Sequence, residues 1–380
     1  MGLQKLNDSD WPPLTLEVND NTFRKRVTLQ DIKMTEHKPI LLCMGNPLLD
    51  ISVVADESLL KKYDLKANDA ILAEEKHKPL YEELVKSYKP DYVAGGAAQN
   101  VARAAQYILQ PNSTVYFGCV GNDQFAEQMR NAAQREGLIA DYLVTDEHPT
   151  GTCGVIITNN HRSLVANLSA AEQYKDSSHI DLPEKWEIVK NVKFYYITGF
   201  FMSSSISSML KVAKHAAETN KPFMFNLSAP FICLAPQMKK SLSEIVPYCD
   251  IIFGNESEAE AFAVSENWQS KDLRGIALKI ATLPKINTSR SRIVIITHGS
   301  EPTIVANQDL SIYEVPIIPI NVEEIVDTNG AGDSFAGGFL SQYVQGKTIE
   351  ECVNAGHWLA NINIKRVGPT FPEEKIPYPS

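Results

Sequence analysis

Several signatures of other protein classes are absent from this chain of 380 residues. Its six cysteines form no CxxC pair, the N-terminal part has no apolar stretch of the roughly 7–15 residues that a secretory signal needs, and no apolar run approaches the about 18 residues of a membrane span. Positive charge is scarce, and the net charge of −10 argues against an extended basic surface for nucleic acid or membranes. We therefore expect a soluble intracellular protein, cytoplasmic with a nuclear location left open, whose thiols are reduced and buried.

The common catalytic motifs are absent as well. The chain contains no GxxxxGK[ST] loop, no HRD and DFG pair, no HExxH helix and no GxGxxG turn after its first apolar run. P-loop enzymes, protein kinases, zinc proteases and dinucleotide-binding oxidoreductases are thereby disfavoured. A phosphate site in this chain would have to be built in another way.

Short, continuously apolar runs alternate with segments of helical periodicity. This alternation predicts an α/β fold with a central, mostly parallel sheet and helices on both faces. The expected strands are residues 40–44, 115–120, 153–158, 192–198, 223–227, 250–253 and 292–297. The expected helices are residues 97–109, 123–137 and 205–218, the segment after residue 330, and a helix opened by the capping box Thr348–Glu351.

Three segments depart from this rhythm. Residues 1–38 are charged and aperiodic, and we interpret them as an N-terminal extension of a domain that spans residues 39–380. The stretches near 50–75 and 150–170 show strands and turns with polar alternation. We expect these two stretches to form a small, discontinuous β lid.

The most informative motif is IVDTNGAGDSFAGGFL, residues 325–340. Gly330, Ala331 and Gly332 are small enough for a ligand to approach the backbone, and the helix that follows would direct free N–H groups at a phosphate. Asp333, in the first helical turn, could take a proton from a substrate hydroxyl. A turn followed by a carboxylate that favours the helix dipole explains the same residues without any ligand.

The pattern DTxGAGD followed by FxxGF resembles the signature of the ribokinase, or pfkB carbohydrate and nucleoside kinase, family. The resemblance implies a ribokinase-like fold and an ATP-dependent kinase with Asp333 as the catalytic base. In such a kinase the N–H groups of Gly330, Ala331 and Gly332 stabilise the transferred phosphoryl group. Magnesium is expected to come with ATP, without direct ligands from the protein.

Two further segments resemble the family's sugar-binding residues. GNPLLD at 45–50 offers Asn46 and Asp50 to a nucleoside and its ribose diol, and GGAAQN at 95–100 offers Gly95, Gly96 and Asn100. Each segment also fits a purely structural role, as a strand-end cap or as a glycine turn before a helix.

On the nucleotide side, Asn255-Glu-Ser-Glu258 resembles the family's N-x-x-E pattern, which helps to organise Mg²⁺ and phosphate. An Asn N-cap with acidic residues in the first turn is the structural alternative. The ATP and magnesium contacts implied by the resemblance are Asn255, Glu258, Thr297, Gly299, Asn329 and His357, of which His357 also fits a packing role.

The segments at 149–171, 198–201, 226–232 and 355–372 resemble the adenosine kinase subfamily. That resemblance implies transfer of the ATP γ-phosphoryl group to the 5′-hydroxyl of adenosine, by a monomer that binds neither nucleic acid nor membranes. Arg162 would meet the transferred phosphate, although an exposed arginine is often only surface charge. The apolar slot for the purine would be formed by Leu49, Leu72, Cys153, Leu164, Phe201 and Phe231, of which the aromatic residues also fit a plain core.

Two positions depart from the subfamily. Ala97 replaces a serine in GGSTQN, which removes a hydrogen bond worth about 0.5–1.5 kcal/mol, and Ala70 stands where a glutamine is common. Nucleoside specificity is therefore open, with a kinase for inosine, guanosine or a free sugar as one alternative. A non-catalytic nucleoside sensor is the other.

Overall fold

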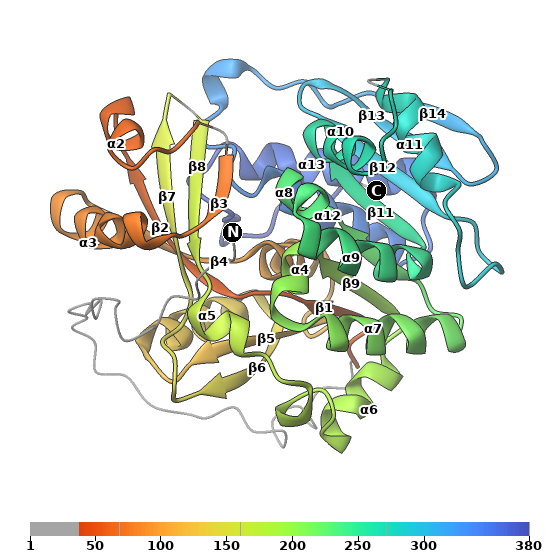
Figure 1. Ribbon diagram of the computed structural model, residues 1–380, viewed down its shortest axis with the longest axis horizontal. Coiled ribbons are helices and arrows are strands. Elements are labelled where there is room, and N and C mark those ends of the chain that lie inside the picture. Colours follow the sequence, from red (N-terminus) through yellow and green to blue (C-terminus); the bar gives the residue numbers. More distant parts are fainter. Residues whose placement is uncertain (1–37, 68, 160, 271, 380) are drawn as a thin grey trace.

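A nine-stranded sheet runs through the larger part of the molecule, and a five-stranded sheet stands beside it (Figure 1). The computed structural model describes residues 38–379, except 68, 160 and 271. The N-terminal extension predicted for residues 1–38 lies, apart from its last residue, outside this range.

The larger sheet has the strand order β14-β13-β12-β11-β10-β9-β1-β5-β6. All neighbouring strands from β12 to β6 are parallel, whereas β13 and β14 are antiparallel additions at one edge. The strands are β1 (Leu41–Met44), β5 (Thr114–Gly121), β6 (Ile139–Thr145), β9 (Phe194–Thr198), β10 (Phe223–Asn226), β11 (Ile251–Asn255), β12 (Ile293–His298), β13 (Glu301–Asn307) and β14 (Ile312–Val315).

Helices cover both faces of this sheet, because its parallel strands are apolar on both sides. One core packs the sheet against α6 (Pro183–Asn191), α7 (Met202–Glu218), α8 (Pro230–Leu234), α9 (Pro236–Ile245), α10 (Glu256–Ser265) and α11 (Leu273–Ala281). The opposite core packs it against α4 (Ala97–Ile108), α5 (Gln124–Glu136), α12 (Ala331–Tyr343) and α13 (Ile349–Asn363). The predicted α/β architecture and the capping box at Thr348 are confirmed.

The smaller sheet has the order β3-β8-β7-β2-β4 and combines two distant parts of the chain. Its strands are β2 (Leu48–Val54), β3 (Asp69–Leu72), β4 (Asp91–Gly95), β7 (Thr152–Thr158) and β8 (His161–Asn167). One face packs against α2 (Glu57–Lys62) and α3 (Lys78–Ser87), on the outside of the molecule in Figure 1. The other face carries a small apolar cluster. Whether this sheet moves as a lid stays a prediction.

All six cysteines are free and buried, as predicted for reduced thiols. Among the described residues, no helix has the length and apolar character needed to cross a lipid bilayer.

A fully buried arginine, directly before β12, bonds the backbone of segments that precede β11 and β12. Arg292 is 0 % exposed, and burial lowers the pKa of its guanidinium. Its three nitrogens donate to the backbone carbonyls of Val246, Cys249, Ile280, Leu283 and Pro284 at 2.7–3.2 Å. The side chain therefore bonds the carbonyl groups of several segments, of which Val246 O and Ile280 O also accept from the backbone N–H groups of Cys249 and Leu283.

We expect Arg292→Met to lower the free energy of unfolding by at least about 3 kcal/mol, since the buried carbonyls of Cys249, Leu283 and Pro284 lose a donor at about 1–3 kcal/mol each. Urea denaturation followed by circular dichroism measures the change. The control is Arg274→Met, which removes the exposed pair with Glu314 and should cost less than about 1 kcal/mol. Equal effects of the two substitutions would contradict this assignment.

Candidate active site

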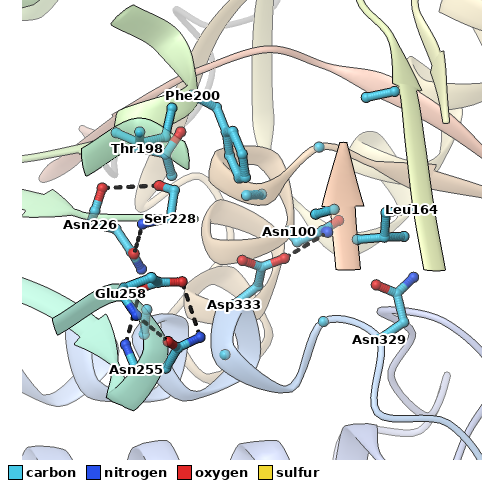
Figure 2. Close-up of a pocket in the computed structure, with 18 of the residues that line it drawn as sticks. Asn100, Leu164, Thr198, Phe200, Asn226, Ser228, Asn255, Glu258, Asn329 and Asp333 are labelled. Atoms are coloured by element: carbon cyan, nitrogen blue, oxygen red, sulfur yellow. Dashed lines mark hydrogen bonds between the residues drawn. The ribbon is translucent and has the colours of Figure 1, made fainter. Parts of the chain in front are cut away.

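A cavity of about 500 Å³ lies between the two sheets, at the carboxyl ends of the parallel strands. Asn46, Thr198, Asn226, Asn255 and Thr297, which stand at or just after the ends of β1, β9, β10, β11 and β12, all line it. Ligands of open α/β sheets bind at this edge, where loops from neighbouring strands converge. Figure 2 shows Asp333 between the Asn255–Glu258 pair on one side and Asn329 and Leu164 on the other.

The turn before α12 is fixed by a buried carboxylate. Asp327 accepts hydrogen bonds from the backbone N–H groups of Asn329 and Gly368, both at 2.8 Å. Gly330 then adopts a φ of +74°, which glycine tolerates without strain. Gly332 has no atom within 4 Å of the place where a Cβ would stand. The backbone at Gly332 is therefore open to close approach by a ligand.

The first turn of α12 offers free N–H groups at this opening. Ala331 N–H donates to Thr328 O at 3.2 Å, and Ser334 N–H closes the first helical bond to Gly330 O. The N–H groups of Gly332 and Asp333 precede any intrahelical acceptor. The sequence predicted the N–H groups of Gly330, Ala331 and Gly332 as donors to a phosphate. In the structure the N–H of Ala331 is already bonded to Thr328 O, and the free donors of the first turn are the N–H groups of Gly332 and Asp333. Together with the helix dipole they suit an anion.

Asp333 carries its carboxyl group into the cavity. Its Oδ2 accepts a hydrogen bond from Asn100 Nδ2 at 2.9 Å. The cavity gives the side chain partial access to water, but the surrounding protein removes most of the solvent. This burial raises the pKa of Asp333 to about 6, against the opposing effects of the Asn100 hydrogen bond and the Arg162 charge. The carboxyl is therefore ionised above about pH 6 and remains basic enough to accept a proton.

Two further carboxyl groups that line the cavity have raised pKa values. Burial, followed by the charge of Asp333, raises the pKa of Asp50 to about 7, and the nearby Asn329 amide partly opposes the rise. Burial also raises the pKa of Glu258 to about 7, although the backbone N–H of Asn255 bonds to its carboxyl and lowers it. Closely spaced acidic groups of this kind are favoured only when cations or hydrogen-bond donors compensate them.

The Asn255–Glu258 pair forms a capping box at the start of α10. Asn255 Oδ1 accepts from Glu258 N–H at 2.9 Å, and Glu258 Oε2 accepts from Asn255 N–H at 3.0 Å. Asn255 Nδ2 also donates to Glu258 Oε1 at 3.0 Å. The structural role that the sequence left open is therefore present, and both residues still line the cavity. Thr297 and Gly299 line it from the neighbouring β12–β13 turn.

Apolar side chains form the opposite part of the cavity. Leu72, Cys153 and Leu164 line it from the smaller sheet. Phe231 faces them from the larger domain, with Phe200 beside it at a ring-centroid distance of 6.0 Å. The apolar and aromatic lining of this slot suits a flat aromatic base.

The sequence named the wrong member of the Phe200–Phe201 pair. Phe201 is 0 % exposed and packs edge-to-face on Tyr174 in the core, at a centroid distance of 5.2 Å. The reason is the 3₁₀ turn at Gly199–Phe201, which sends successive side chains in different directions. Phe200 lines the cavity instead.

Three other predicted residues do not line the cavity. Leu49 is buried in the core against α4. Gly95 makes room for Asp50, since a Cβ at this position would lie 2.2 Å from Asp50 Oδ1. His357 is hydrogen-bonded to Thr303 Oγ1 at 2.8 Å, and burial lowers its pKa to about 4, so it has the packing role that the sequence left open.

The sequence analysis named the segment 226–232 and its Phe231 but gave no role to Asn226 and Ser228, which follow β10 and line the cavity. Asn226 Oδ1 accepts from Ser228 N–H at 2.8 Å, and Ser228, with a φ of +72°, accepts from Gly199 N–H at 2.9 Å. These bonds join the ends of β9 and β10 beneath Phe200. Asn226 could have been predicted as a site residue, because it is a polar residue at the carboxyl end of an apolar run.

Two polar atoms in the described part of the cavity are buried and unpaired. They are Asn100 Oδ1 and Arg162 Nε, and both residues line the cavity. Buried polar atoms without a partner are costly and mark places where a ligand or water completes the hydrogen bonds. Gly96, Asn46 and Asp50 lie in the same wall. The site therefore fits a polar, anionic ligand joined to an apolar ring.

Comparison with known proteins gives this site a family. The model of the pfkB family carbohydrate kinases matches residues 57–376. Adenosine kinase 2 of Arabidopsis thaliana is 48 % identical over 337 residues, which cover 88 % of this chain and 96 % of the relative. Adenosine kinase of Schizophyllum commune is 48 % identical over 340 residues, which cover 88 % of this chain and 98 % of the relative.

Solved structures agree with the sequence matches. The Anopheles gambiae adenosine kinase in complex with P1,P4-di(adenosine-5) tetraphosphate superposes with a TM-score of 0.85 at 45 % identity, covering 88 % of this chain and 99 % of that one. The Schistosoma mansoni adenosine kinase in complex with 2-fluoroadenosine does so with a TM-score of 0.85 at 36 % identity, covering 88 % and 98 %.

The chain belongs to the pfkB family of carbohydrate kinases. Within that family, the relatives described above are adenosine kinases. The ribokinase-like fold and the class of ATP-dependent nucleoside kinase that the sequence predicted are confirmed.

We expect Asn100→Leu to raise the pKa of Asp333 above its value of about 6, because the donor that stabilises the carboxylate is lost and the apolar side chain keeps water out. A pH titration of the protein with ¹³C-labelled aspartate carboxyls, followed by NMR, measures the shift. Ser311→Ala is the control, since it removes a hydroxyl donor from the exposed Asp309 only. An unchanged or lower pKa in Asn100→Leu would contradict the assignment.

Proposed function

We propose that this protein is an adenosine kinase that transfers the ATP γ-phosphoryl group to the 5′-hydroxyl of adenosine, giving AMP and ADP. The observation that carries the proposal is the position of Asp333. Its carboxyl lies beside the free N–H groups that begin α12, and the same cavity contains an apolar slot lined by Phe200 and Phe231. A base, an anion site and a purine slot in one cavity are the parts that this reaction needs.

The acceptor would bind between the two sheets. The purine would lie against Phe200 and Phe231, with Leu164 and its neighbours closing the slot from the smaller sheet. The Asp50 carboxylate and the unpaired Asn100 Oδ1 would accept hydrogen bonds from the ribose hydroxyls. Asn46 would act indirectly, because its amide already bonds Phe200 O and Ser204 Oγ.

The transfer itself would be driven by position and charge. Asp333 accepts the proton of the 5′-hydroxyl as the oxygen attacks the γ-phosphorus. The N–H groups of Gly332 and Asp333 and the guanidinium of Arg162 stabilise the charge on the transferring group. Closure of the smaller sheet over the cavity would exclude water, which otherwise competes as acceptor. Movement of residues 48–95 and 152–167 relative to the rest is part of this proposal.

Magnesium fits the same site. No three His, Cys, Asp or Glu side chains in the described part of the chain are grouped as metal ligands, so the ion would be held by the ATP phosphates and by water. Glu258 and Asn255 are the residues that would hold that water, as hard oxygen donors at the cavity wall. The ion would neutralise phosphate charge during transfer.

Two positions bear on specificity. Ala97 and Ala70 both line the cavity, so the hydroxyl and amide groups expected there in the subfamily are missing from the wall. We propose that adenosine is still accepted, with its binding determined mainly by the aromatic slot and Asp50. A monomeric state and a cytoplasmic or nuclear location remain predictions from the sequence.

We expect Asp333→Ala to lower kcat by at least about 10²-fold while adenosine binding is largely kept, because the substitution removes the proton acceptor and leaves the purine slot intact. Stopped-time assays of AMP formation and calorimetric titration with adenosine measure the two quantities. Asp309→Ala, which changes an exposed carboxylate of the β13–β14 turn, is the matched control. Near-normal turnover in Asp333→Ala would overturn the proposed role.

The substrate is tested by ADP release with Mg·ATP in the presence of adenosine, inosine, guanosine, ribose or fructose. We expect fast turnover with adenosine at micromolar concentration, since the free sugars lack an aromatic base for the slot, and inosine and guanosine carry a carbonyl at C6 where adenosine carries an amino group. A better sugar or another nucleoside would keep the kinase class and refute the specificity. Stabilisation by adenosine in a thermal-shift assay without any ADP release would identify a sensor instead.

A further inference from the structure

Helix α7 is interrupted close to the cavity. Within this helix Ser205 has non-helical angles, a φ of −157° and a ψ of 82°. The residue just before it is linked by hydrogen bonds to Phe200, which lines the cavity. Ser204 Oγ donates to Asn46 Oδ1 at 2.7 Å, and Asn46 Nδ2 donates to Phe200 O at 3.1 Å. Ser203 Oγ also donates to Phe200 O, at 2.9 Å. The path of the chain at the break therefore determines where the Phe200 backbone lies.

A single carboxylate organises the break. Asp176 Oδ1 accepts hydrogen bonds from the hydroxyls of Ser205 at 2.9 Å and Ser207 at 3.1 Å, and from that of Ser208 as well. Asp176 Oδ2 lies 3.3 Å from Lys211 Nζ, one turn further along α7. These bonds to the serines and to Lys211 hold the pKa of Asp176 below its usual range, despite its partial burial. The carboxylate thus remains charged at neutral pH.

The angles at Ser205 are extended, so the helix gives up backbone hydrogen bonds at this point. Side chains can replace them. Here Ser205 Oγ accepts from Ser208 N–H at 3.3 Å, so the serine caps the second part of the helix, while Asp176 holds the same hydroxyl. Without the carboxylate, the three hydroxyls lose their shared acceptor and the helix is free to straighten.

The segment that carries Asp176 also connects the two sheets. It follows β8, the strand that brings Arg162 and Leu164 to the cavity, and it leads on to α6. Tyr174, two residues before Asp176, packs edge-to-face on Phe201, directly after Phe200. Tyr174 OH is bonded to His179 Nδ1 at 2.8 Å. The segment therefore contacts the chain that follows Phe200 at two separate points, Phe201 through Tyr174 and the serines of α7 through Asp176.

We propose that Asp176 is a positioning residue for the purine: it sets the break in α7 and, through Ser204, Asn46 and the Phe200 backbone, the place of the Phe200 ring. This inference rests on the proposed function, since it assigns Phe200 to the purine. Asp176 itself does not line the cavity. It acts on the recognition of the base and leaves the phosphoryl-transfer groups around Asp333 untouched.

The test is steady-state kinetics of Asp176→Ala with adenosine and ATP varied separately. We expect the KM for adenosine to rise by roughly three- to tenfold, the scale of one misplaced aromatic contact, with the KM for ATP unchanged within about twofold. Asp181→Ala is the matched control, because Asp181 pairs with the same Lys211 and bonds none of the three serines. We expect its adenosine KM to equal that of the wild type.

Two further variants separate positioning from a general loss of stability. Asp176→Asn keeps an acceptor oxygen for the serines, so we expect it to restore the adenosine KM to within about twofold of the wild type. In a Phe200→Ala background the ring to be positioned is gone, so Asp176→Ala should add no further increase in adenosine KM. If Asp176→Ala does not fold, Ser205→Ala, which removes one hydroxyl of the cluster, takes its place in the same cycle.

The outcomes are distinguishable. A parallel rise in both KM values, or an increase that persists in the Phe200→Ala background, would overturn the proposal, because a purely structural defect would produce either result. An unchanged adenosine KM in Asp176→Ala would overturn it as well. Failure of the wild-type protein to phosphorylate adenosine would refute the proposed function instead, and calorimetric titration of adenosine in the same variants would then decide the positioning role.

Discussion

The site depends on one buried carboxylate that is not itself part of the chemistry. Asp327 is 1 % exposed and uses both oxygens to hold backbone N–H groups, one in its own turn and one at Gly368 near the C-terminus. These two bonds fix the direction in which the chain enters α12. The free N–H groups and the Asp333 carboxyl then follow from ordinary helix geometry, because the first turn of any helix leaves its N–H groups without acceptors. The free N–H groups and the Asp333 carboxyl therefore keep a fixed position relative to each other, because they belong to adjacent residues of the same helical turn.

The geometry of the larger sheet also brings residues of the site together. Parallel strands place all their carboxyl ends at one edge, so strands that lie far apart in the chain each deliver a polar residue to one cavity without any special device. The smaller sheet adds an apolar surface and a positive charge to the cavity. Leu164 and Arg162 provide them, and both lie on β8. Three of the acidic groups that line the cavity, Asp50, Glu258 and Asp333, have raised pKa values, and burial is the main cause in each case.

The sequence predicted the features that depend on local pattern. Most parallel strands, the helices at 97–109 and 123–137, and the turn around Gly330 all follow from periodicity, caps and glycine. It failed where side-chain direction depends on a turn or on a distant partner. Phe201 was chosen over Phe200 because a 3₁₀ turn follows neither the helical nor the strand period. The engagement of Ala331 N–H by Thr328, the Ser228–Gly199 bond and the Asp176 cluster join residues whose relation appears only when the chain is folded.

The order of strands has a consequence for synthesis of the chain. Strand β1 lies inside the larger sheet, and its partners begin at Thr114 and Phe194, while β2 pairs with a strand that begins at Thr152. A nascent chain therefore carries two apolar strands with open edges through the production of much of the molecule. Pairings of such long sequence separation close slowly and leave strand edges exposed to other chains. Fragments that end before β9 should aggregate rather than fold, because β1 then lacks one of its two neighbours in the larger sheet.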